Sequence, residues 1–353
     1  MQTNSFLLYG ANGYTGTLIA RYANEYQLNP ILAGRNKAAI EPLAKQLNLP
    51  FLIIDLDDSN ALIEALSTVK LVIHAAGPFQ YTAQQMIAAC LKTGTHYIDI
   101  NGDIAVFEMI QTYNEAAKKA GILLMPGAGF DVVPTDCIAM ALKNKMPAAV
   151  SLELAFATLG GSISHGTATT MAGKIGEGGA ARVGGKIIRT SLGHTGKWID
   201  FGIKKIFVMS IPWGDISTAW FSTRIPNITT YTGIRPTIYI LLKLQPLFNW
   251  MLRTNWMRSY IKKKINQAPA GPTDEQRAKA IGLVWGQATD AQGQTVHLRI
   301  SAPEGYTLTT HSALLIAKKI LAGNLKTGYQ TPATAYGEGL IDEIPGVKRI
   351  DNL

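Results

Sequence analysis

A glycine-rich turn near the N-terminus constrains this chain more than any other feature. Residues 5–9 form a short apolar run, the segment Gly10-Ala-Asn-Gly13-Tyr-Thr-Gly16 follows, and residues 17–26 have a helical pattern. A strand, a glycine turn and a helix in this order predict free backbone N–H groups at the helix N-terminus, where the helix dipole also favours negative charge. The turn therefore predicts a dinucleotide site, although a glycine loop with no ligand is the alternative. The residues expected to bind the dinucleotide here are Gly10, Asn12, Gly13, Tyr14, Thr15 and Gly16.

The end of the next expected strand, at residues 31–33, indicates which dinucleotide binds. In such a unit an acidic side chain at this place holds the ribose hydroxyls of NAD. Here the first ionisable side chain is Arg35. A planar guanidinium with a permanent charge suits a 2′-phosphate, so we expect NADP(H). A solvated arginine at the end of a strand is the alternative.

The first 125 residues alternate between short apolar runs and amphipathic helical stretches. Such alternation predicts parallel strands joined by right-handed crossovers, hence an α/β fold with a doubly wound Rossmann sheet. Ligands of this fold bind outside the carboxyl ends of the strands. The expected strands are residues 6–9, 31–33, 51–54, 71–75, 96–100 and 122–125, and the expected helices are 37–46, 61–66, 83–92 and 106–119.

Two of these strand ends add candidates for cofactor binding. Asp55 follows the third strand and is expected near the adenine, while a helix cap at Asp58 or Ser59 is the alternative for this acidic segment. The fourth strand ends in His74, which is either a proton donor or, more simply, a packed histidine. The small residues after it allow the nicotinamide ribose to approach the backbone, and the candidates there are Ala76, Gly77 and Pro78.

The fifth expected strand carries polar side chains at alternate positions, which is unusual for a strand buried on both faces. Tyr97, Asp99 and Asp103 are therefore candidates for catalysis, with structural hydrogen bonding by Asp99 as the alternative. After the sixth strand a glycine-rich loop leads into a helix. Asp131 or Thr135 is expected to cap that helix, and the loop is expected to close over the nicotinamide side.

The pattern changes near residue 149. Strand-like segments follow one another without regular crossovers, which predicts a mixed or antiparallel sheet in a second, α+β domain. We expect a Rossmann domain at residues 1–130 and a substrate or dimerisation domain at 131–304, with residues 305–353 packing back on the first domain and including a helix at 309–321. The expected strands are residues 151–158, 197–201, 206–211, 219–223, 228–232, 280–289 and 295–301.

Composition narrows the class of protein. The chain has 353 residues, of which 47% are hydrophobic and 16% charged, so we expect a folded protein with room for two domains. The formal net charge of +9 is not concentrated in a terminal tail, so nucleic-acid binding is not expected. Cys90 and Cys137 lie in apolar helical patterns and read as buried free thiols in a reducing compartment. The sequence shows no signal peptide, membrane span or metal motif, which favours a cytoplasmic location.

One stretch, residues 235–264, combines apolar and aromatic residues with basic ones and contains no acid. Tryptophans and basic residues on an apolar helix are typical of a peripheral membrane contact. A helical hairpin that buries its apolar face against the domain or in a homodimer is the alternative.

With these segments in place, the chain resembles the saccharopine dehydrogenase-like oxidoreductases, and within them the branch of trans-acting enoyl reductases. The resemblance implies NADP(H) bound between a Rossmann domain and an α+β domain. Family members reduce either C=C or C=N bonds. The segments that carry the resemblance are residues 10–16, 33–35, 75–79, 96–102, 127–136, 164–167, 212–218, 225–227, 283–286, 303–306 and 330–332.

The leading expectation for function is a reductase that passes hydride from NADPH to an activated, enoyl-type double bond of an acyl or lipid-like substrate. Such a reaction needs a donor that polarises the carbonyl and a proton source. His165, in a glycine-rich loop, joins Tyr97, Asp99 and Asp103 as a candidate, although a surface histidine is the alternative. An imine or amino-acid reductase of the saccharopine type and a non-catalytic NADP(H) sensor are the competing expectations.

Overall fold

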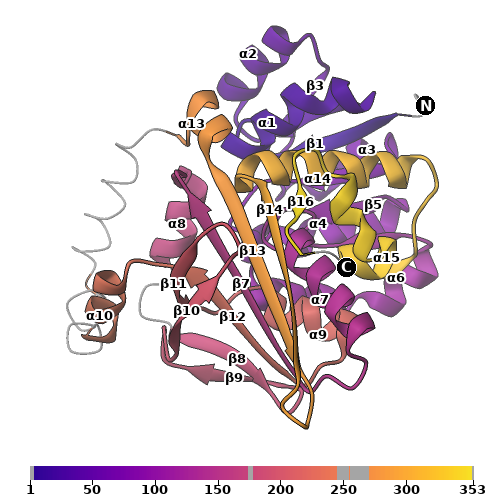
Figure 1. Ribbon diagram of the computed structural model, residues 1–353. Coiled ribbons are helices and arrows are strands. Elements are labelled where there is room, and N and C mark those ends of the chain that lie inside the picture. The colour runs from indigo at the N-terminus through magenta and orange to yellow at the C-terminus, as the bar shows by residue number, and fades with distance from the viewer. Residues whose placement is uncertain (1–3, 174–177, 245–253, 255–269, 352–353) are drawn as a thin grey trace. The chain divides into compact units, whose positions relative to one another are not determined.

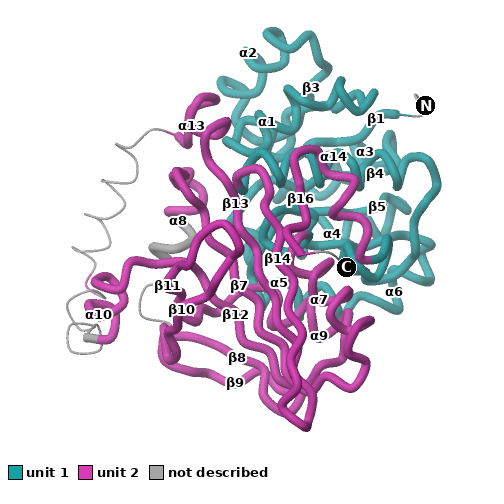
Figure 2. Tube along the Cα trace, viewed as in Figure 1, with its two compact units in different colours: residues 1–133, 305–337 teal, residues 134–304, 338–353 magenta. Residues whose placement is uncertain are grey.

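The chain forms two compact units in the computed structural model, which describes residues 4–173, 178–244, 254 and 270–351. Unit 1 comprises Met1–Val133 and Gly305–Gly337, and unit 2 comprises Pro134–Glu304 and Glu338–Leu353 (Figure 2). The chain thus returns to unit 1 at Gly305 and crosses back to unit 2 at Glu338.

Unit 1 is built on a seven-stranded parallel sheet with the order β15-β6-β5-β4-β1-β2-β3. Figure 1 labels β1, β3 and β5 of this sheet. The order reverses between β1 and β4, which makes their carboxyl ends the topological switch point of a Rossmann sheet. The predicted doubly wound sheet is therefore confirmed. Its strands are β1 (Ser5–Tyr9), β2 (Asn29–Gly34), β3 (Phe51–Ile53), β4 (Leu71–His74), β5 (His96–Asp99), β6 (Leu123–Met125) and β15 (Gly328–Tyr329).

The central strands of this sheet form the core of unit 1. Phe6, Leu7 and Leu8 of β1 and Val72 and Ile73 of β4 are fully buried, as expected where helices cover both faces of a parallel sheet. The helical stretch expected at 106–119 is interrupted at residues 112–113 and forms two helices, α5 and α6. The helices of unit 1 are α1 (Tyr14–Tyr22), η1 (Ala23–Tyr26), α2 (Lys37–Leu47), α3 (Ser59–Ser67), α4 (Phe79–Thr93), α5 (Ile104–Gln111), α6 (Asn114–Ala120), α14 (Gly305–Leu321) and α15 (Pro332–Tyr336).

Unit 2 contains a nine-stranded sheet whose main path runs β10-β11-β12-β7-β13-β14-β16, with β8 and β9 attached beside β12. Strands β12 and β7 are parallel and the other pairs antiparallel, so the predicted mixed sheet is confirmed. The strands are β7 (Ser151–Leu159), β8 (Gly179–Val183), β9 (Lys186–Thr190), β10 (Gly196–Asp200), β11 (Lys205–Ser210), β12 (Asn227–Gly233), β13 (Ile281–Thr289), β14 (Thr295–Pro303) and β16 (Lys348–Arg349).

The strand predicted at residues 219–223 is wrong, because these residues end helix α9. The run Ala-Trp-Phe-Ser-Thr is short and apolar, and periodicity alone does not separate a strand from a buried helix at this length. Asp215 in the first turn, which favours a helix N-terminus, was the overlooked signal. The helices of unit 2 are α7 (Val133–Lys145, whose first residue belongs to unit 1), α8 (His165–Gly173), α9 (Asp215–Thr223), α10 (Pro236–Leu244), α13 (Asp274–Lys279) and η3 (Glu338–Glu343).

An arginine in β14 links strands from opposite ends of the sheet of unit 2. Arg299 of β14 forms an ion pair with Asp351 and lies 3.5 Å from Asp200 at the end of β10. A cluster of buried apolar residues fills the face between them: Ala155, Ala157, Ile199, Phe201, Val208, Tyr231, Leu283 and Trp285. The sheet therefore curls so that one face becomes an internal core.

Candidate nucleotide-binding site

The glycine turn connects the ends of three strands at the switch point of unit 1. Gly10 has φ +85°, and a Cβ at this position would lie 2.7 Å from the backbone of Ala75 after β4. The Gly10 N–H donates to the carbonyl of Ala33 in β2 at 2.8 Å. A Cβ on Gly16 would collide with the Gly10 carbonyl, so helix α1 packs directly on the turn. Only glycine fits these positions, which is the arrangement that dinucleotide turns require.

Helix α1 begins without a side-chain cap. Its N-cap residue is Gly13, no side chain caps it, and no acid lies in its first turn. A Cβ on Gly13 would have only the Gly10 carbonyl within 3.3 Å and the Ala75 carbonyl at 4.0 Å. Since the first N–H groups of a helix have no partner within the helix, this end is suited to bind a pyrophosphate.

Helix α2 repeats this feature beside Arg35. Its N-cap residue Asn36 makes no side-chain cap, and its first turn contains no acid. Arg35 is exposed immediately before it, and in the described chain no hydrogen bond or ion pair joins its guanidinium to another side chain. The oxygen Oδ1 of Asn12 lies near Gly34, since a Cβ there would be 3.3 Å away. A guanidinium and a helix N-terminus side by side form a site for a phosphate monoester.

Tyr9 lies close to the same place. Its hydroxyl donates to the carbonyl of Ile54 at 3.1 Å. Burial, together with the carboxylate of Asp55, raises the pKa of Tyr9 to about 12, while the Arg35 guanidinium acts in the opposite direction. Asp55 is exposed and accepts from the Asp57 N–H, so it remains a candidate for contact with the adenosine part. Asp58 instead caps α3 through the Ala61 N–H at 3.0 Å, as the alternative interpretation held.

The turn after β4 forms the third side of the candidate site. The Ala75 N–H donates to the Tyr9 carbonyl at 2.8 Å, and the Thr82 hydroxyl donates to the Ala76 carbonyl at 2.9 Å. The Gly77–Pro78 peptide bond is cis. Pro78 is the N-cap residue of α4, which again has no side-chain cap and no acid in its first turn. Ala76, Gly77 and Pro78 therefore present backbone next to the glycine turn.

His74 lies beneath this turn and is completely buried. Its ring packs edge-on against the rings of Tyr9, Phe79 and Tyr97 at centroid distances of 5.3–6.0 Å. Burial lowers the pKa of His74 to about 3, although the nearby Ala76 backbone acts in the opposite direction. The imidazole is therefore neutral near pH 7 and packed in an aromatic environment, as the simpler of the two interpretations held.

Tyr97 and Asp99, both predicted to be catalytic, are also completely buried. The Tyr97 hydroxyl donates to Asp99 Oδ2 at 2.6 Å, and Asp99 Oδ1 accepts from the N–H groups of Asn101 and Gly127 at 3.0 and 2.8 Å. Burial raises the pKa of Asp99 in spite of these bonds. Asp99 thus fastens the end of β5 to the loop after β6. In this arrangement neither side chain has a surface on which to meet a substrate, so their placement supports the structural alternative.

The two other predicted catalytic residues lie in different units. Asp103 caps α5, because its carboxylate accepts from the Ala105 N–H at 2.9 Å. His165 is the first residue of α8 in unit 2, is partly exposed, and donates its backbone N–H to the Ala270 carbonyl at 3.0 Å. The structure brings Tyr97 and Asp99 together, and Asn101 links Asp103 to this pair: the Asn101 N–H donates to Asp99 Oδ1, and Asn101 Oδ1 accepts from the Asp103 N–H. Their catalytic roles stay predictions.

The loop after β6 differs partly from the expectation. The Asp131 carboxylate packs against Gly102, where a Cβ would lie 3.1 Å from the Asp131 Cβ. Thr135 lies inside α7 and donates to the buried carboxylate of Asp215 at 2.6 Å. Thr135 is the third residue of α7 and so does not occupy the N-cap position that the expectation gave it as one of two candidates.

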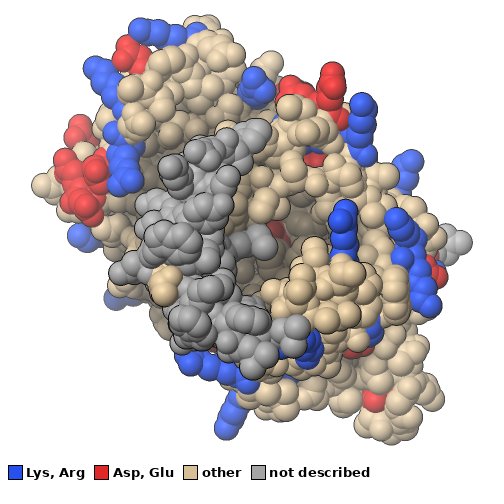
Figure 3. Space-filling model, turned by 90° about the vertical axis from the view of Figure 1, so that its left-hand side faces the viewer, with Lys and Arg blue, Asp and Glu red and all other residues tan. Residues whose placement is uncertain are grey.

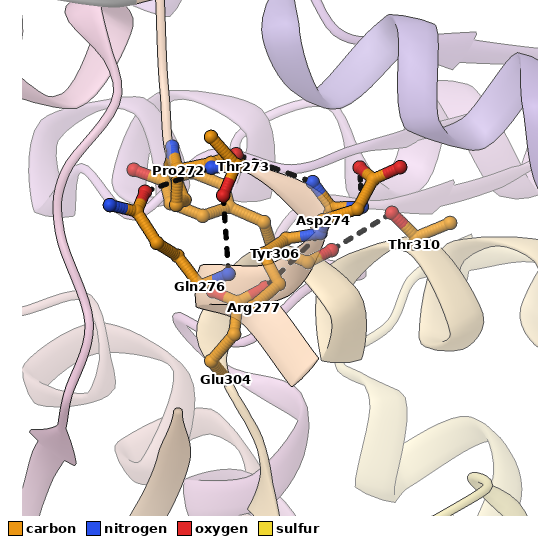
Figure 4. Close-up of polar contacts among 8 residues, drawn as sticks. All are labelled: Pro272, Thr273, Asp274, Gln276, Arg277, Glu304, Tyr306 and Thr310. Carbon is orange, nitrogen blue, oxygen red and sulfur yellow. Dashed lines mark hydrogen bonds and ion pairs between the residues drawn. The ribbon is translucent and has the colours of Figure 1, made fainter. Parts of the chain in front are cut away.

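The buried arginines of unit 2 have internal partners, which bears on carboxylate substrates. Arg277 of α13 donates to Asp274 at 2.8 Å and to the Pro272 carbonyl, and lies 3.9 Å from the buried Glu304 (Figure 4). Arg182 donates to the carbonyls of Ile216 and Gly185 at 2.7 and 2.6 Å. Neither is placed as an open carboxylate clamp in the described part of unit 2.

Sequence reasoning overlooked one signal that the structure makes plain. The helices after β1, β2 and β4 begin without a side-chain cap, whereas those after β3 and β5 begin with an aspartate cap. The residues at these helix starts can be read from the sequence, and their difference agrees with a dinucleotide site around the glycine turn. Among the described residues, no group of three or more His, Cys, Asp or Glu side chains could hold a metal ion.

Comparison with known proteins supports this assignment. Residues 6–125 match the model of the saccharopine dehydrogenase NADP binding domain. The chain is 27% identical over 186 residues to human saccharopine dehydrogenase-like oxidoreductase, an alignment that covers 46% of this chain and 43% of the relative. It is 27% identical over 138 residues to a trans-acting enoyl reductase of Mycobacterium ulcerans, covering 37% of this chain and 33% of the relative. The chain thus spans less than half the length of these relatives in the aligned part.

A solved structure extends the likeness in fold over the whole chain. Apo saccharopine dehydrogenase (L-Glu forming) from Saccharomyces cerevisiae superposes with a TM-score of 0.68 at 14% identity, covering 99% of this chain and 100% of that one. At this identity the likeness concerns the fold alone. The family model covers the segment that contains the glycine turn, Arg35 and the turn after β4. The similarity to the saccharopine dehydrogenase NADP binding domain therefore lies within unit 1.

Proposed function

We propose that the chain is an NADP(H)-dependent oxidoreductase. The observation that carries this proposal is the set of uncapped helix N-termini around the glycine turn, together with Arg35 before α2. The amides of α1 would hold the pyrophosphate, and Arg35 with the start of α2 would hold the 2′-phosphate. The turn at Ala76, Gly77 and Pro78 would support the nicotinamide ribose. When bound, the cofactor supplies or accepts a hydride.

For the substrate we propose an activated, enoyl-type double bond on an acyl or lipid-like molecule. The aligned trans-acting enoyl reductase supports this choice, as does the absence of an open carboxylate clamp among the buried arginines described in unit 2. An imine or amino-acid reductase of the saccharopine type is the second candidate, because the fold is that of a saccharopine dehydrogenase. A sensor that binds NADP(H) without turnover is the third.

One assay separates these three candidates. NADPH binding is measured first by fluorescence titration, and its oxidation is then followed at 340 nm with enoyl thioesters and with oxo acids plus amines. Oxidation with the thioesters alone supports the enoyl reductase. Oxidation only with the oxo acid and amine mixtures supports the second candidate, and tight binding without oxidation supports the sensor. A chain that does not bind NADPH contradicts all three.

We further propose that α10 contacts an anionic lipid surface. Ile240 and Leu241 of α10 are 60% and 66% exposed, and the neighbouring Trp198 of β10 is 56% exposed. Tyr239 and Trp198 both pack against Phe207, which joins the helix to the sheet. The basic residues Arg253, Arg258 and Lys262–Lys264 of the stretch at 235–264 lie outside the described residues. Apolar and aromatic side chains next to basic sequence favour binding at a membrane interface.

The lipid proposal concerns surface contact only. In the part of the chain that the structure describes, no helix is both long and apolar enough to cross a membrane. On the face shown in Figure 3, Lys and Arg side chains are scattered and acidic ones lie among them, so the exposed apolar side chains carry the proposal. Ile240→Ser with Leu241→Ser should weaken binding to phosphatidylserine-containing vesicles without changing NADPH affinity. Equal vesicle binding by the variant and the unmodified chain would contradict the lipid proposal. A homodimer contact through α10 would then be the alternative, and sedimentation would test whether the chain forms a dimer.

A further inference from the structure

We propose that Tyr306, at the start of α14, completes the NADP(H) site and contacts the bound cofactor beside the pyrophosphate. The residue lies 181 positions beyond the end of the matched segment at residue 125. The inference rests on the proposed function, since it assumes that the glycine turn binds the dinucleotide. It adds a binding residue that neither the glycine turn nor the family model contains.

The first observation is an aromatic contact at the edge of the glycine turn. Tyr14, the first residue of α1, packs edge-on against Tyr306 with ring centroids 4.9 Å apart and an interplanar angle of 81°. Tyr14 directly follows Gly13, the N-cap residue of the uncapped helix. The rings of Tyr14 and Tyr306 are both partly exposed. Tyr306 therefore lies next to the amides that are expected to hold the pyrophosphate.

The second observation is that α1 and α14 begin at the same place. A second edge-on contact joins Tyr22, the last residue of α1, to His311 of α14 at 5.4 Å. Because the early residues of both helices meet and the later residues meet, the two helices run in the same general direction. Their positive dipole ends are thus brought together near the glycine turn.

The third observation is that the start of α14 is held rigidly. The Phe130 N–H donates to Thr309 Oγ1 at 2.9 Å, and Ser312 Oγ donates to the Ala128 carbonyl at 2.9 Å. A Cβ on Gly129 would lie 2.8 Å from Thr309 Cγ2, so the loop after β6 packs closely on the helix. The backbone carbonyl of Tyr306 accepts from the Thr310 hydroxyl at 2.8 Å (Figure 4). These contacts anchor the backbone of α14 at Tyr306 to the loop after β6.

The test compares Tyr306→Ala with Tyr22→Ala, a matched variant on the same helix pair. Removing Tyr306 should weaken NADPH binding roughly three- to tenfold, because an aromatic contact is lost at the ligand. Tyr306→Phe should restore affinity to within about twofold, since the ring and not the hydroxyl makes the contact with Tyr14. Tyr22→Ala removes a comparable contact far from the turn and should leave the affinity unchanged. Dissociation constants are measured by fluorescence titration on the full chain.

A second measurement on the unmodified protein does not depend on how the variants fold. Tetranitromethane nitrates accessible tyrosines, and peptide mass mapping gives the nitration of Tyr306 and of Tyr22 separately. Saturating NADPH should protect Tyr306 and leave Tyr22 unprotected. Unchanged nitration of Tyr306, or equal loss of affinity in the Tyr306→Ala and Tyr22→Ala variants, would overturn the inference while the proposed function stands. A protein that binds no NADPH at all would overturn both.

Discussion

Helices that leave the same edge of one sheet begin in two different ways. Those after β3 and β5 are capped, by Asp58 and Asp103 respectively. Those after β1, β2 and β4 begin at Gly13, Asn36 and Pro78 with no side-chain cap and no acid in the first turn. A helix N-terminus whose N–H groups have no side-chain acceptor is less stable than a capped one. Three uncapped N-termini are therefore expected where a bound ligand supplies the acceptors.

The difference between capped and uncapped helices supports the proposed position of the cofactor. The uncapped helices follow the strands on both sides of the switch point, and β2, which lies next to β1. This is the path of a dinucleotide across a Rossmann sheet. The capped helices follow β5, which lies next to β4, and β3 at the edge of the sheet, and there aspartate side chains satisfy the backbone. Four predictions can break or sharpen this comparison.

The largest effect is expected for Gly10→Ala, in the turn that leads into the uncapped helix α1. Its Cβ would lie 2.7 Å from the Ala75 backbone at φ +85°, so strain and collision add. We expect a loss of about 2–5 kcal/mol in the free energy of unfolding, measured with urea, and loss of NADPH binding.

Gly94→Ala is the matched control for Gly10→Ala. Gly94 also has a positive φ of +71°, but a Cβ there would meet nothing within 4 Å. It should cost only about 1–2 kcal/mol and leave NADPH affinity unchanged. Equal losses in the two variants would show that the close approach of β1 and β4 does not matter.

The second prediction concerns pH, through His74 beneath the open turn. Because burial lowers the pKa of His74 to about 3, from the ordinary value of 6.5, the unfolded chain binds a proton that the folded chain does not. Stability from this group is therefore complete above pH 6.5 and is lost as the pH falls toward 3. Between pH 6 and pH 4 the free energy of unfolding should fall by about 2–3 kcal/mol on account of His74.

His74→Gln provides the comparison, since glutamine does not titrate. Urea unfolding at several pH values between 4 and 7 gives, for each protein, the slope of the free energy of unfolding against pH. The slope of the variant should be smaller by roughly 1.4 kcal/mol per pH unit. Identical slopes would mean that the pKa of His74 is the same in the folded and unfolded chains, which would leave His74 able to act as the proton donor that the sequence allowed.

The third prediction concerns Arg35, which lies before the uncapped helix α2 and is proposed to bind the 2′-phosphate. Arg35→Ala should weaken NADPH binding by about 1.5–3 kcal/mol, the value of a charge-assisted contact, and leave NADH binding almost unchanged. Calorimetric titration with both nucleotides measures the difference. Lys45→Ala, at the other end of α2, removes the same charge away from the site and should affect neither nucleotide. Equal losses for NADPH and NADH in Arg35→Ala would exclude Arg35 from binding the 2′-phosphate.

Local features of the chain could be read from the sequence, and contacts between distant residues could not. The glycine turn, Arg35 and the alternation of unit 1 are patterns within a few residues, and they predicted the Rossmann sheet and its cofactor. The two-residue strand β15 is too short to show a period. Tyr97 and Asp99 looked catalytic because polar residues in a buried strand are unusual, yet their partners at His74 and Gly127 explain them.

The role of a polar residue in a buried strand depends on its burial and on its hydrogen-bond partners. Both depend on residues far apart in the chain. Thr309 accepts a hydrogen bond from the loop residue Phe130, which lies 179 positions earlier in the chain, and no sequence pattern in either segment predicts this contact. The same holds for the contact of Tyr14 with Tyr306. Asp103, in contrast, could have been recognised as a cap, because it directly precedes a helical segment.

The smallest effect is expected for Asp103 in the capped region, where two roles give different outcomes. If Asp103 acts as a cap, Asp103→Ala should cost about 1 kcal/mol in the free energy of unfolding, and Asp103→Asn should restore it because asparagine also caps. NADPH affinity should be the same in both variants and in the unmodified chain. If Asp103 instead transfers a proton, Asp103→Asn would retain stability and lose turnover with whichever substrate the panel identifies. Urea unfolding and the rate of NADPH oxidation, measured on the same preparations, therefore decide whether the capped edge of the sheet takes part in the chemistry.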